Sequence, residues 1–342
     1  MRVIDCDGPG ITRRRAATGF TYRDEDGHRV DDPDVVDRIK ALAIPPAWTD
    51  VWICPAPRGH IQATGYDVKG RRQYRYHDQW RARRDREKHD RVLELARALP
   101  RLRERLARDL AGKGVGRDRV LAAAVRLLEL GLFRVGGEAY VEDGSYGLAT
   151  VRKGHVRAVR GELRFDYPAK SGKRRIVTIG DPEVADVVRA LKRRRRGGPE
   201  LLAYKDERGR WVDVRSADIN EYLQDALGPG FSAKDFRTWA ATVLAAVALA
   251  AEEAQADDDP SESQRRRAVA RVVKDVAHQL GNTPAVARGS YVDPRVIERF
   301  EHGETVDDDL DGDVDGADPE VLAEIEAAVV ALIERSAGRR RG

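Results

Sequence analysis

Cysteine and methionine are scarce in this chain of 342 residues, which contains two cysteines and one methionine. Cys6 and Cys54 do not form a Cys-x-x-Cys motif, so the sequence predicts neither a disulfide framework nor a zinc site. No apolar run approaches the length of a membrane span, and the N-terminal residues lack the apolar core of a signal peptide. We therefore expect a soluble cytoplasmic protein that contacts no membrane.

Acidic residues are fewer than basic ones in the chain as a whole, but the C-terminal end is strongly acidic. Residues 301–342 carry 4 Lys+Arg against 13 Asp+Glu, a net charge of −9, whereas the whole chain carries +4. The rest of the chain therefore carries +13, which is typical of a protein that binds a polyanion such as nucleic acid. A GC-rich genome, which favours arginine over lysine, would explain a similar bias, so composition alone leaves both interpretations open.

The pattern of apolar residues predicts an α+β protein with two domains. Residues 1–85 alternate apolar and polar side chains between glycine turns, which is typical of a small β-rich domain. Residues 86–303 repeat apolar side chains at spacings of three and four, which is typical of a larger, mainly helical domain. Residues 146–179 interrupt this helical pattern with the alternation of a strand meander.

Local signals in the larger domain predict where its helices begin and end. Pro100 predicts a break or kink, Asp118 an N-cap, and Gly131 the end of a helix. The stretch 251–267 is polar, charged and broken by proline, so we expect a mobile insertion there.

Residues 304–342 are expected to form an acidic tail with a short C-terminal helix. The DGDVDG motif at 311–316 matches the first half of an EF-hand loop. The twelfth position of that loop is Leu322, where a bidentate glutamate is required. We therefore expect no calcium site in the tail.

Several polar residues occur where an anion could bind, although each has an ordinary structural explanation. Arg134 follows an apolar helix and precedes two glycines, where an arginine is commonly a solvated helix end. Lys170 and Lys173 lie at an expected hairpin tip, where lysines commonly promote solubility. Lys234 and Arg237 share a face near an expected helix start, where the helix dipole disfavours cations unless an anion binds.

The order of these residues is more informative than any one of them. An arginine, a hairpin lysine, a Lys-x-x-Arg helix start, a Gly-x-Thr-Pro motif that contains Asn282, and then Tyr291 follow one another. This order resembles the type IB DNA topoisomerases, in particular the poxvirus-like form found in bacteria. The segments that carry the resemblance are GHIQATGYDVKGRRQYRYHDQW, LFRVGGEAYVEDGSYGLATVRKGHV, KDFRTW and GNTPAVARGSYVDP.

The resemblance extends from about Gly19 to Phe300, and it implies a fold and a partner. The implied fold is a small β-rich domain and a mainly α-helical catalytic domain of the tyrosine recombinase and topoisomerase IB type. Together they would form a C-shaped clamp around double-stranded DNA. We expect a monomer that associates with the nucleoid.

The resemblance also implies roles for particular residues. Tyr291 would be the nucleophile, and Arg134 and Arg237 would bind the non-bridging phosphate oxygens. Lys170 would protonate the leaving 5′-oxygen, with Lys173 as the alternative. The expected DNA-binding residues are Gln73, Tyr74, Tyr76, Lys153, His155, Lys173 and Lys234.

Asn282 stands where the viral and eukaryotic relatives usually have a histidine. A side-chain amide can donate to a phosphate oxygen as an imidazole does, but it cannot act as an acid or base near neutral pH. The asparagine therefore favours a charge-stabilising role at this position and leaves the acid role to Lys170. His278 is close in sequence but lies outside the Gly-x-Thr-Pro motif, so we do not assign it this role.

The implied chemistry is a reversible transesterification through a 3′-phosphotyrosyl intermediate, without ATP. Because two arginines supply positive charge, we expect no metal and no cofactor. Two alternatives stay open at this point. A tyrosine recombinase would use similar residues but commonly has His-x-x-Arg where this chain has Lys234 to Arg237. A DNA-binding protein that has lost catalysis is the other alternative.

Overall fold

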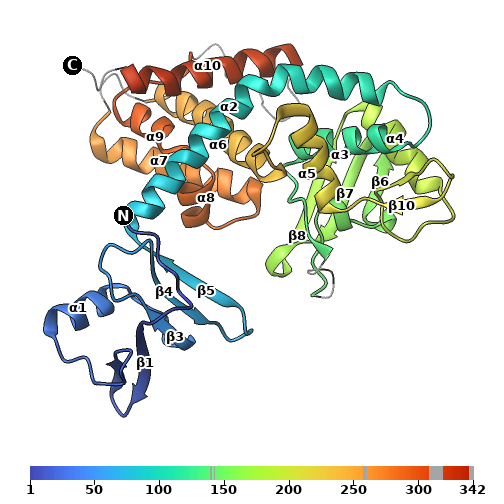
Figure 1. Ribbon diagram of the computed structural model, residues 1–342. Coiled ribbons are helices and arrows are strands. Elements are labelled where there is room, and N and C mark those ends of the chain that lie inside the picture. Colours follow the sequence, from blue (N-terminus) through green and yellow to red (C-terminus); the bar gives the residue numbers. More distant parts are fainter. Residues whose placement is uncertain (139–140, 142, 257–259, 308–318, 339–342) are drawn as a thin grey trace. The chain divides into compact units, whose positions relative to one another are not determined.

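The computed structural model describes residues 1–138, 141, 143–256, 260–307 and 319–338 (Figure 1). The chain divides into two compact units, Met1–Lys88 and His89–Gly342. The division lies close to the boundary expected near residue 85, and it falls inside one long helix, α2 (Asp78–Leu110). Among the described helices, none combines the length and the apolar composition that a bilayer crossing requires.

The first unit is a five-stranded antiparallel sheet with the strand order β2-β1-β3-β4-β5. The strands are β1 (Ile11–Ala16), β2 (Gly19–Arg23), β3 (Thr49–Ile53), β4 (Ile61–Tyr66) and β5 (Arg72–Tyr76). Helix α1 (Pro33–Ala41) begins after Asp32, whose carboxylate accepts hydrogen bonds from the backbone N–H groups at the helix start. A small core that includes Ile39 and Ile53 joins helix and sheet.

The second unit is mainly helical and contains a three-stranded antiparallel sheet. Its strands are β6 (Val156–Val159), β7 (Glu162–Pro168) and β8 (Arg174–Ile179), in the order β6-β7-β8. A short 3-10 turn, η4 (Lys170–Gly172), forms the tip between β7 and β8. A separate two-stranded ribbon consists of β9 (Ala203–Lys205) and β10 (Trp211–Asp213). The three-stranded sheet is the meander that the alternation in the sequence predicted.

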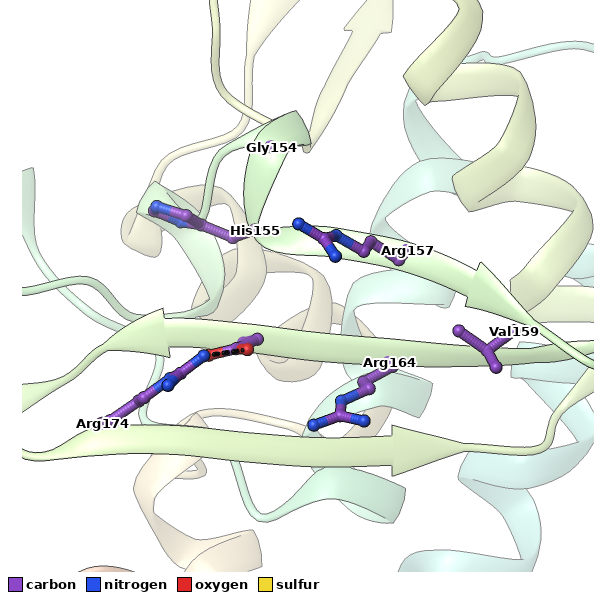
Figure 2. A pocket seen from close by; sticks show the side chains of 7 residues that line it. Gly154, His155, Arg157, Val159, Arg164 and Arg174 are labelled. Carbon is purple, nitrogen blue, oxygen red and sulfur yellow. Dashed lines mark hydrogen bonds and ion pairs between the residues drawn. The ribbon is translucent and has the colours of Figure 1, made fainter.

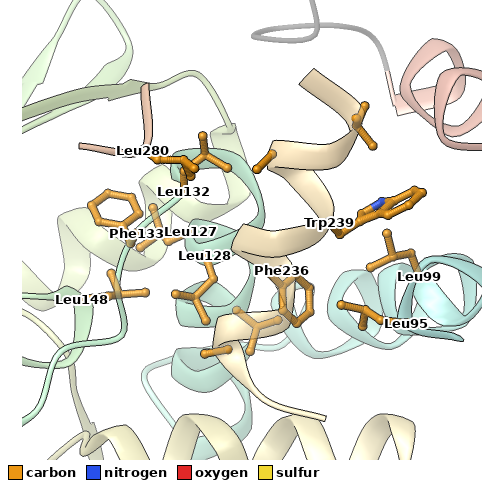
Figure 3. Packing of buried hydrophobic residues seen from close by; sticks show 14 of the residues in the cluster. Leu95, Leu99, Leu127, Leu128, Leu132, Phe133, Leu148, Phe236, Trp239 and Leu280 are labelled. Atoms are coloured by element: carbon orange, nitrogen blue, oxygen red, sulfur yellow. The ribbon is translucent and has the colours of Figure 1, made fainter. Parts of the chain in front are cut away.

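The helices of the second unit surround one continuous apolar core, part of which is drawn in Figure 3. Besides α2 they are α3 (Arg117–Gly131), α4 (Pro182–Arg193), α5 (Ser216–Leu227), α6 (Ala233–Ala254), α7 (Glu262–Leu280), α8 (Pro284–Ser290), α9 (Pro294–Glu301) and α10 (Pro319–Gly338). Leu95 and Leu99 of α2, Leu128 of α3, and Phe236 and Trp239 of α6 meet in this core (Figure 3). The core positions the ends of these helices, where the candidate site lies.

One expected helix cap is wrong, and Pro100, which predicted a break or a kink, does not break its helix. Helix α2 continues through Pro100, because Leu99 and Leu102, each 1% exposed, bury apolar surface on both sides of it and offset the lost hydrogen bond. The N-cap of α3 is Gly116, and Asp118 lies in its first turn, where a carboxylate favours the helix dipole.

Gly131 is the last residue of α3, but the left-handed turn that ends the helix is made by Leu132, with φ 49°. A glycine is needed at 131 for a different reason than the one we expected. A Cβ atom there would lie 2.1 Å from Cε2 of Phe133, whose buried ring folds back over this position.

The segment 251–267, where we expected a mobile insertion, is helical over most of its described length. Helix α6 extends to Ala254, and α7 begins at Glu262 after the N-cap Ser261. The charged residues pair across the connection, since the Arg265 guanidinium lies 2.7 Å from the Glu253 carboxylate. Favourable capping and this ion pair explain why polar composition did not prevent helix formation here.

The C-terminal helix is also more than the short element of an acidic tail that the sequence suggested. Helix α10 has 20 residues, and its Ile325, Val329, Leu332 and Ile333 are buried in the main core. Its contribution to that core makes it part of the second unit. The DGDVDG motif at 311–316 lies outside the described residues.

Candidate active site

The candidate site is built on the C-terminal ends of two helices, α3 and α7, which Arg237 of α6 joins. The Arg237 side chain is 2% exposed, and it donates through Nη1 to the carbonyl oxygen of Leu132. Through Nη2 it donates to the carbonyl oxygen of Leu280, at 2.8 Å. Carbonyl groups at a helix C-terminus carry partial negative charge, which favours a cation at this position. The contact fixes the two helix ends next to each other.

Arg134 lies three residues after the end of α3, Asn282 lies two residues after the end of α7, and the two side chains contact each other. The Arg134 Nη2 group donates to the Asn282 side-chain oxygen. The chain reaches Asn282 through Gly281, which adopts φ 65° and ends α7 in a left-handed turn. The Asn282 backbone N–H donates to the carbonyl oxygen of Ala277 at 2.8 Å. Its side-chain nitrogen is buried and has no hydrogen-bond partner among the described residues.

Tyr291 follows the short helix α8 and lies against Arg237. Its backbone N–H donates to the carbonyl oxygen of Ala287 at 2.9 Å. Its own carbonyl oxygen accepts a hydrogen bond from the Thr242 hydroxyl of α6 at 3.3 Å. The Arg237 guanidinium carbon is 5.5 Å from the centre of the tyrosine ring. The structure therefore brings together Arg134, Arg237, Asn282 and Tyr291, which the sequence had singled out.

The charges around Tyr291 favour its ionised form. Burial alone would raise the pKa of Tyr291, but the positive charges of Arg237 and Arg134 outweigh it and lower that pKa below 10. Burial, followed by repulsion from Arg134, lowers the pKa of Arg237 in turn. Within the described residues, neither arginine forms an ion pair with a carboxylate; they donate to carbonyl and amide oxygens. Their positive charge is therefore available to an anion.

The structure does not bring Lys170 into contact with these four residues. Lys170 begins the η4 turn at the tip of the β7–β8 hairpin, and its side chain is exposed. Lys173, which ends that turn, is exposed as well. Both lysines are thus at the hairpin tip, as predicted, and the choice between them as the acid stays a prediction.

The other predicted DNA-binding residues of the second unit differ in how free their side chains are. Lys234 is exposed, whereas Arg237, three residues further along the same helix, is buried. The Lys153 ammonium donates to the carbonyl oxygen of Arg194 at 3.4 Å. His155 Nδ1 accepts from the backbone N–H of Arg152 at 3.2 Å, and burial lowers the pKa of His155.

In the first unit the predicted residues lie on β5, and the strand alternation separates them. Tyr74 and Tyr76 project from one face, are 40% and 45% exposed, and stack with ring centres 6.0 Å apart. The guanidinium of Arg72 on the same face lies 5.7 Å from the Tyr74 ring centre. Gln73 alternates with these residues, and its amide donates to Asp67 at 3.0 Å. The two tyrosines form an exposed aromatic pair.

One residue that the sequence analysis missed, Arg175, contacts the same helix ends as Arg237. It lies on β8, and its guanidinium donates to the carbonyl oxygens of Gly131 and Gln279, each at 2.8 Å. Strand parity could have found it, because Arg175 occupies the same face of β8 as Val177 and Ile179, which turn toward the core. An arginine on the inward face of a strand predicts a polar partner there.

The outer face of the three-stranded sheet carries a groove of about 490 Å³ (Figure 2). Its lining consists of Gly154, His155, Arg157, Val159, Arg164, Asp166 and Arg174. Arg157 and Arg164 are directly opposite each other on β6 and β7, whereas two hydrogen bonds of 2.6 Å join Arg174 to Asp166. The groove opens on the opposite side of β8 from the Arg175 side chain.

Comparison with known proteins identifies the family. The family described as "Eukaryotic DNA topoisomerase I, catalytic core" matches residues 77–305. The family described as "Bacterial DNA topoisomerase IB, N-terminal domain" matches residues 19–67. DNA topoisomerase 1B of Acanthamoeba polyphaga mimivirus is 32% identical over 298 residues, which span 86% of this chain and 88% of the viral protein. The chain belongs to the type IB DNA topoisomerases.

This membership confirms the resemblance that the sequence motifs indicated, together with the α+β fold class. It identifies the chain as an isomerase whose partner is DNA. The first match begins one residue before α2 and ends just after α9, so it contains every member of the Tyr291 cluster. The second match covers most of the sheet of the first unit.

Proposed function

We propose that this chain relaxes supercoiled DNA by cutting and resealing one strand, with Tyr291 as the nucleophile. The observation that supports this most directly is the placement of Tyr291 beside two arginines that make no ion pair with a carboxylate in the described part of the chain. A phosphodiester is an anion that would enter such a site favourably.

Tyr291 attacks the phosphorus through its phenolic oxygen, and the bond from phosphorus to the 5′-oxygen breaks. A tyrosine is ordinarily protonated at neutral pH. The lowered pKa of Tyr291 beside Arg237 and Arg134 supports this role, because the phenolate character that the attack requires costs less there. The product is a 3′-phosphotyrosyl link and a free 5′-hydroxyl, which attacks back to reseal the strand.

Arg134, Arg237 and Asn282 stabilise the charge on the non-bridging oxygens in the transition state. The guanidinium groups are anchored before substrate binds, since their partners are main-chain and amide oxygens at helix ends. The Asn282 amide nitrogen, buried and without a partner in the described part of the chain, supports a donor role toward the phosphate. Donors fixed in advance in this way stabilise a transition state most effectively.

Lys170 donates the proton to the departing 5′-oxygen. Its exposed position at the hairpin tip supports this role, because the tip is able to enter a DNA groove. The exposed pair Tyr74 and Tyr76 contacts the duplex, with Lys173 and Lys234 as further contacts. Gln73, Lys153 and His155 are weaker candidates, because each has a hydrogen bond within the protein. We propose that the protein acts as a monomer near the nucleoid.

We propose further that neither ATP nor a metal is required. The transesterification conserves the energy of the phosphodiester, and the arginines supply the charge that a metal would otherwise provide. Among the described residues, the only three-residue group of potential metal ligands is Asp24, Asp26 and His28, which belongs to the first unit and not to the Tyr291 cluster.

The experiment that tests the proposal is relaxation of supercoiled plasmid in EDTA without ATP, combined with denaturant trapping of the covalent adduct. We expect relaxation without paired recombination sites, and a protein–DNA adduct that is linked through Tyr291. Activity that required two recombination sites would indicate a recombinase. Binding without an adduct would indicate an inactive DNA-binding protein, and complete loss of activity in EDTA would indicate a metal-dependent enzyme.

A further inference from the structure

The side chain of Arg175 crosses from the hairpin strand β8 to the two helix ends that carry the candidate site. It donates to the carbonyl oxygens of Gly131 and Gln279 at 2.8 Å, and to that of Leu132 at 3.3 Å. Gly131 and Leu132 end α3, and Gln279 lies in the last turn of α7. Arg237 donates to Leu132 as well, so the two arginines share one carbonyl group. Arg175 therefore joins three elements: the hairpin, α3 and α7.

Neighbouring residues on β8 have opposite environments. Arg174 faces outward, is paired with Asp166, and has 71% of its side chain exposed. Arg175 is half-buried on the inner face and is bonded to main-chain carbonyl groups. The two arginines have the same charge and are adjacent in sequence. They differ mainly in their partners, because Arg174 joins β8 to β7, whereas Arg175 joins β8 to the ends of α3 and α7.

The position of Lys170 depends on the hairpin that Arg175 anchors. Within the described residues no hydrogen bond or ion pair holds the Lys170 ammonium, whose side chain is exposed. The tip is closed by the Ala169 N–H, which donates to the carbonyl oxygen of Lys173 at 2.7 Å. The strand register then places Arg175 opposite Tyr167, next to the end of the hairpin. Only a few residues of the paired hairpin therefore separate Arg175 from the tip that carries Lys170.

We propose that Arg175 is a positioning residue that aligns the Lys170 hairpin with the phosphate held by Arg134 and Arg237. This inference rests on the proposed function, in which Lys170 is the general acid. Arg134 lies two residues after Leu132, whose carbonyl group accepts hydrogen bonds from both Arg175 and Arg237. Asn282 lies two residues after Leu280, whose carbonyl group accepts from Arg237. Loss of Arg175 leaves the Tyr291 cluster joined by Arg237 and leaves β7 held by the buried ring of Tyr167, but it removes the hydrogen bonds that join β8 to the ends of α3 and α7. Proton delivery to the 5′-oxygen is the step that suffers.

A second role for Arg175 would give a different result. A Cβ atom placed on Gly281 would lie 3.8 Å from Nη1 of Arg175 and 4.0 Å from Nη1 of Arg134, so both guanidinium groups are close to the site. If Arg175 acted through its charge on the phosphate, its loss would slow the reaction whatever the leaving group. A positioning residue for the acid matters only when the leaving group needs a proton.

The test is single-turnover cleavage of two DNA duplexes that differ only at the scissile 5′-bridging atom, oxygen in one and sulfur in the other. A sulfur leaving group needs no proton, so it isolates the acid step. We expect Arg175→Ala to slow cleavage of the oxygen substrate by about 10–100-fold, the usual effect of a displacement of about 1 Å, and to cleave the sulfur substrate nearly as fast as the wild type. Equal slowing on both substrates would overturn the inference.

Two controls separate this inference from the proposed function. Lys170→Ala must itself be rescued by sulfur; if it is not, the acid assignment fails, whatever Arg175 does. In the Lys170→Ala background, Arg175→Ala should cause little further slowing of the oxygen substrate, because both changes remove the same proton transfer. Full additivity would overturn the inference.

The matched control variant is Arg174→Ala, which removes the same charge from the adjacent position on the outer face. It should cleave both substrates at the wild-type rate. Arg175→Lys keeps the charge but cannot bridge three carbonyl groups, so it should show the same sulfur-rescued defect. Wild-type cleavage of the oxygen substrate by Arg175→Lys would overturn the inference, and thermal melting of each variant shows that the folded protein is compared.

Discussion

Two regions of the second unit bury arginine side chains, and the regions differ in the partners of the guanidinium groups. In the first region, between α2, α3 and α10, Arg103 contacts the carboxylates of Glu129 and Glu326 at 2.6 and 2.8 Å. Arg126 contacts Glu129 at 2.6 Å and Asp181 at 3.0 Å. Burial alone would lower the pKa values of Arg103 and Arg126, but the carboxylates outweigh it and raise both. We call this the closed region, because carboxylates within the protein neutralise the charges of its arginines.

In the second region, around Tyr291, the arginines have main-chain carbonyl and amide partners. Here burial and the neighbouring Arg134 lower the pKa of Arg237. Dipoles satisfy the hydrogen bonds of a guanidinium without cancelling its charge. An arrangement that costs stability in the free protein is therefore retained where an anion is expected to bind. The difference teaches that the partner of a buried arginine, more than its burial, distinguishes a structural position from a functional one.

The largest expected effect is that of Tyr291→Phe, which removes only the phenolic oxygen from the second region. Cleavage and relaxation should fall by several orders of magnitude, to the detection limit, because no covalent intermediate can form. Binding of duplex DNA should be nearly unchanged, since both arginines and the ring remain. Plasmid relaxation and a filter-binding assay measure the two properties. A variant that still relaxed plasmid would assign the nucleophile to another tyrosine, with Tyr140 and Tyr146 the next to examine.

Arg103→Ala is the corresponding change in the closed region. It leaves Glu326 buried without its main partner, so we expect the free energy of unfolding to fall by about 3–5 kcal/mol. Cleavage by the protein that remains folded should change little. Chemical denaturation measures the first effect and active-site titration with single-turnover kinetics the second.

Arg97→Ala is the matched control for that experiment, because Arg97 also joins α2 to α10, through Glu334. Both side chains are about half exposed, at 54% and 46%. A surface pair of this kind contributes roughly 0–1 kcal/mol. If the two variants lost equal stability, the closed region would have no special structural role.

Asn282→Ala should slow cleavage by about 10²–10³-fold, the usual loss for one preorganised oxyanion donor. Asn282→His should keep substantial activity, because an imidazole N–H can replace the amide N–H. The wild-type pH profile of single-turnover cleavage should have no limb near pH 6.5, and the His variant should gain one. An Ala variant as fast as the wild type would mean that Asn282 touches no phosphate oxygen. His278 would then be the first candidate for the role.

The order of motifs predicted the members of the Tyr291 cluster, and the periodicities predicted the two units and most of their elements. The contacts that hold the cluster could not be predicted in this way. The acceptors of Arg237 are carbonyl groups of Leu132 and Leu280, and main-chain groups leave no trace in the residue types. Arg175 differs in part, because strand parity could have placed it on the inward face of β8, although its main-chain partners could not be predicted.

Long-range packing explains the remaining failures. The composition of residues 304–342 indicates an acidic tail, yet α10 buries four apolar residues in the core and accepts a hydrogen bond at Glu326 from Trp239 of α6, at 3.0 Å. Whether an amphipathic helix packs depends on a partner surface, and that surface is formed by residues far away in the sequence. Helix α2 continues through Pro100 because of similar tertiary contacts.

The smallest expected effect concerns the titration of Tyr291 and tests directly whether the second region keeps its positive charge. The near-ultraviolet difference spectrum between the wild type and Tyr291→Phe isolates this one phenol. Because nearby cations favour the phenolate, the inflection should lie below pH 10. Arg134→Gln removes one of these charges and leaves an amide of similar reach, so the inflection should move to higher pH. The lowered pKa of Tyr291 also affects the free energy of unfolding. At high pH it stabilises the fold of the wild type relative to the Phe variant, and this stabilisation is lost as the pH falls through the lowered pKa. An inflection at or above pH 10 in the wild type, or one that Arg134→Gln leaves in place, would mean that the charge of the arginines is screened at Tyr291 and that the two regions differ less than their partners suggest.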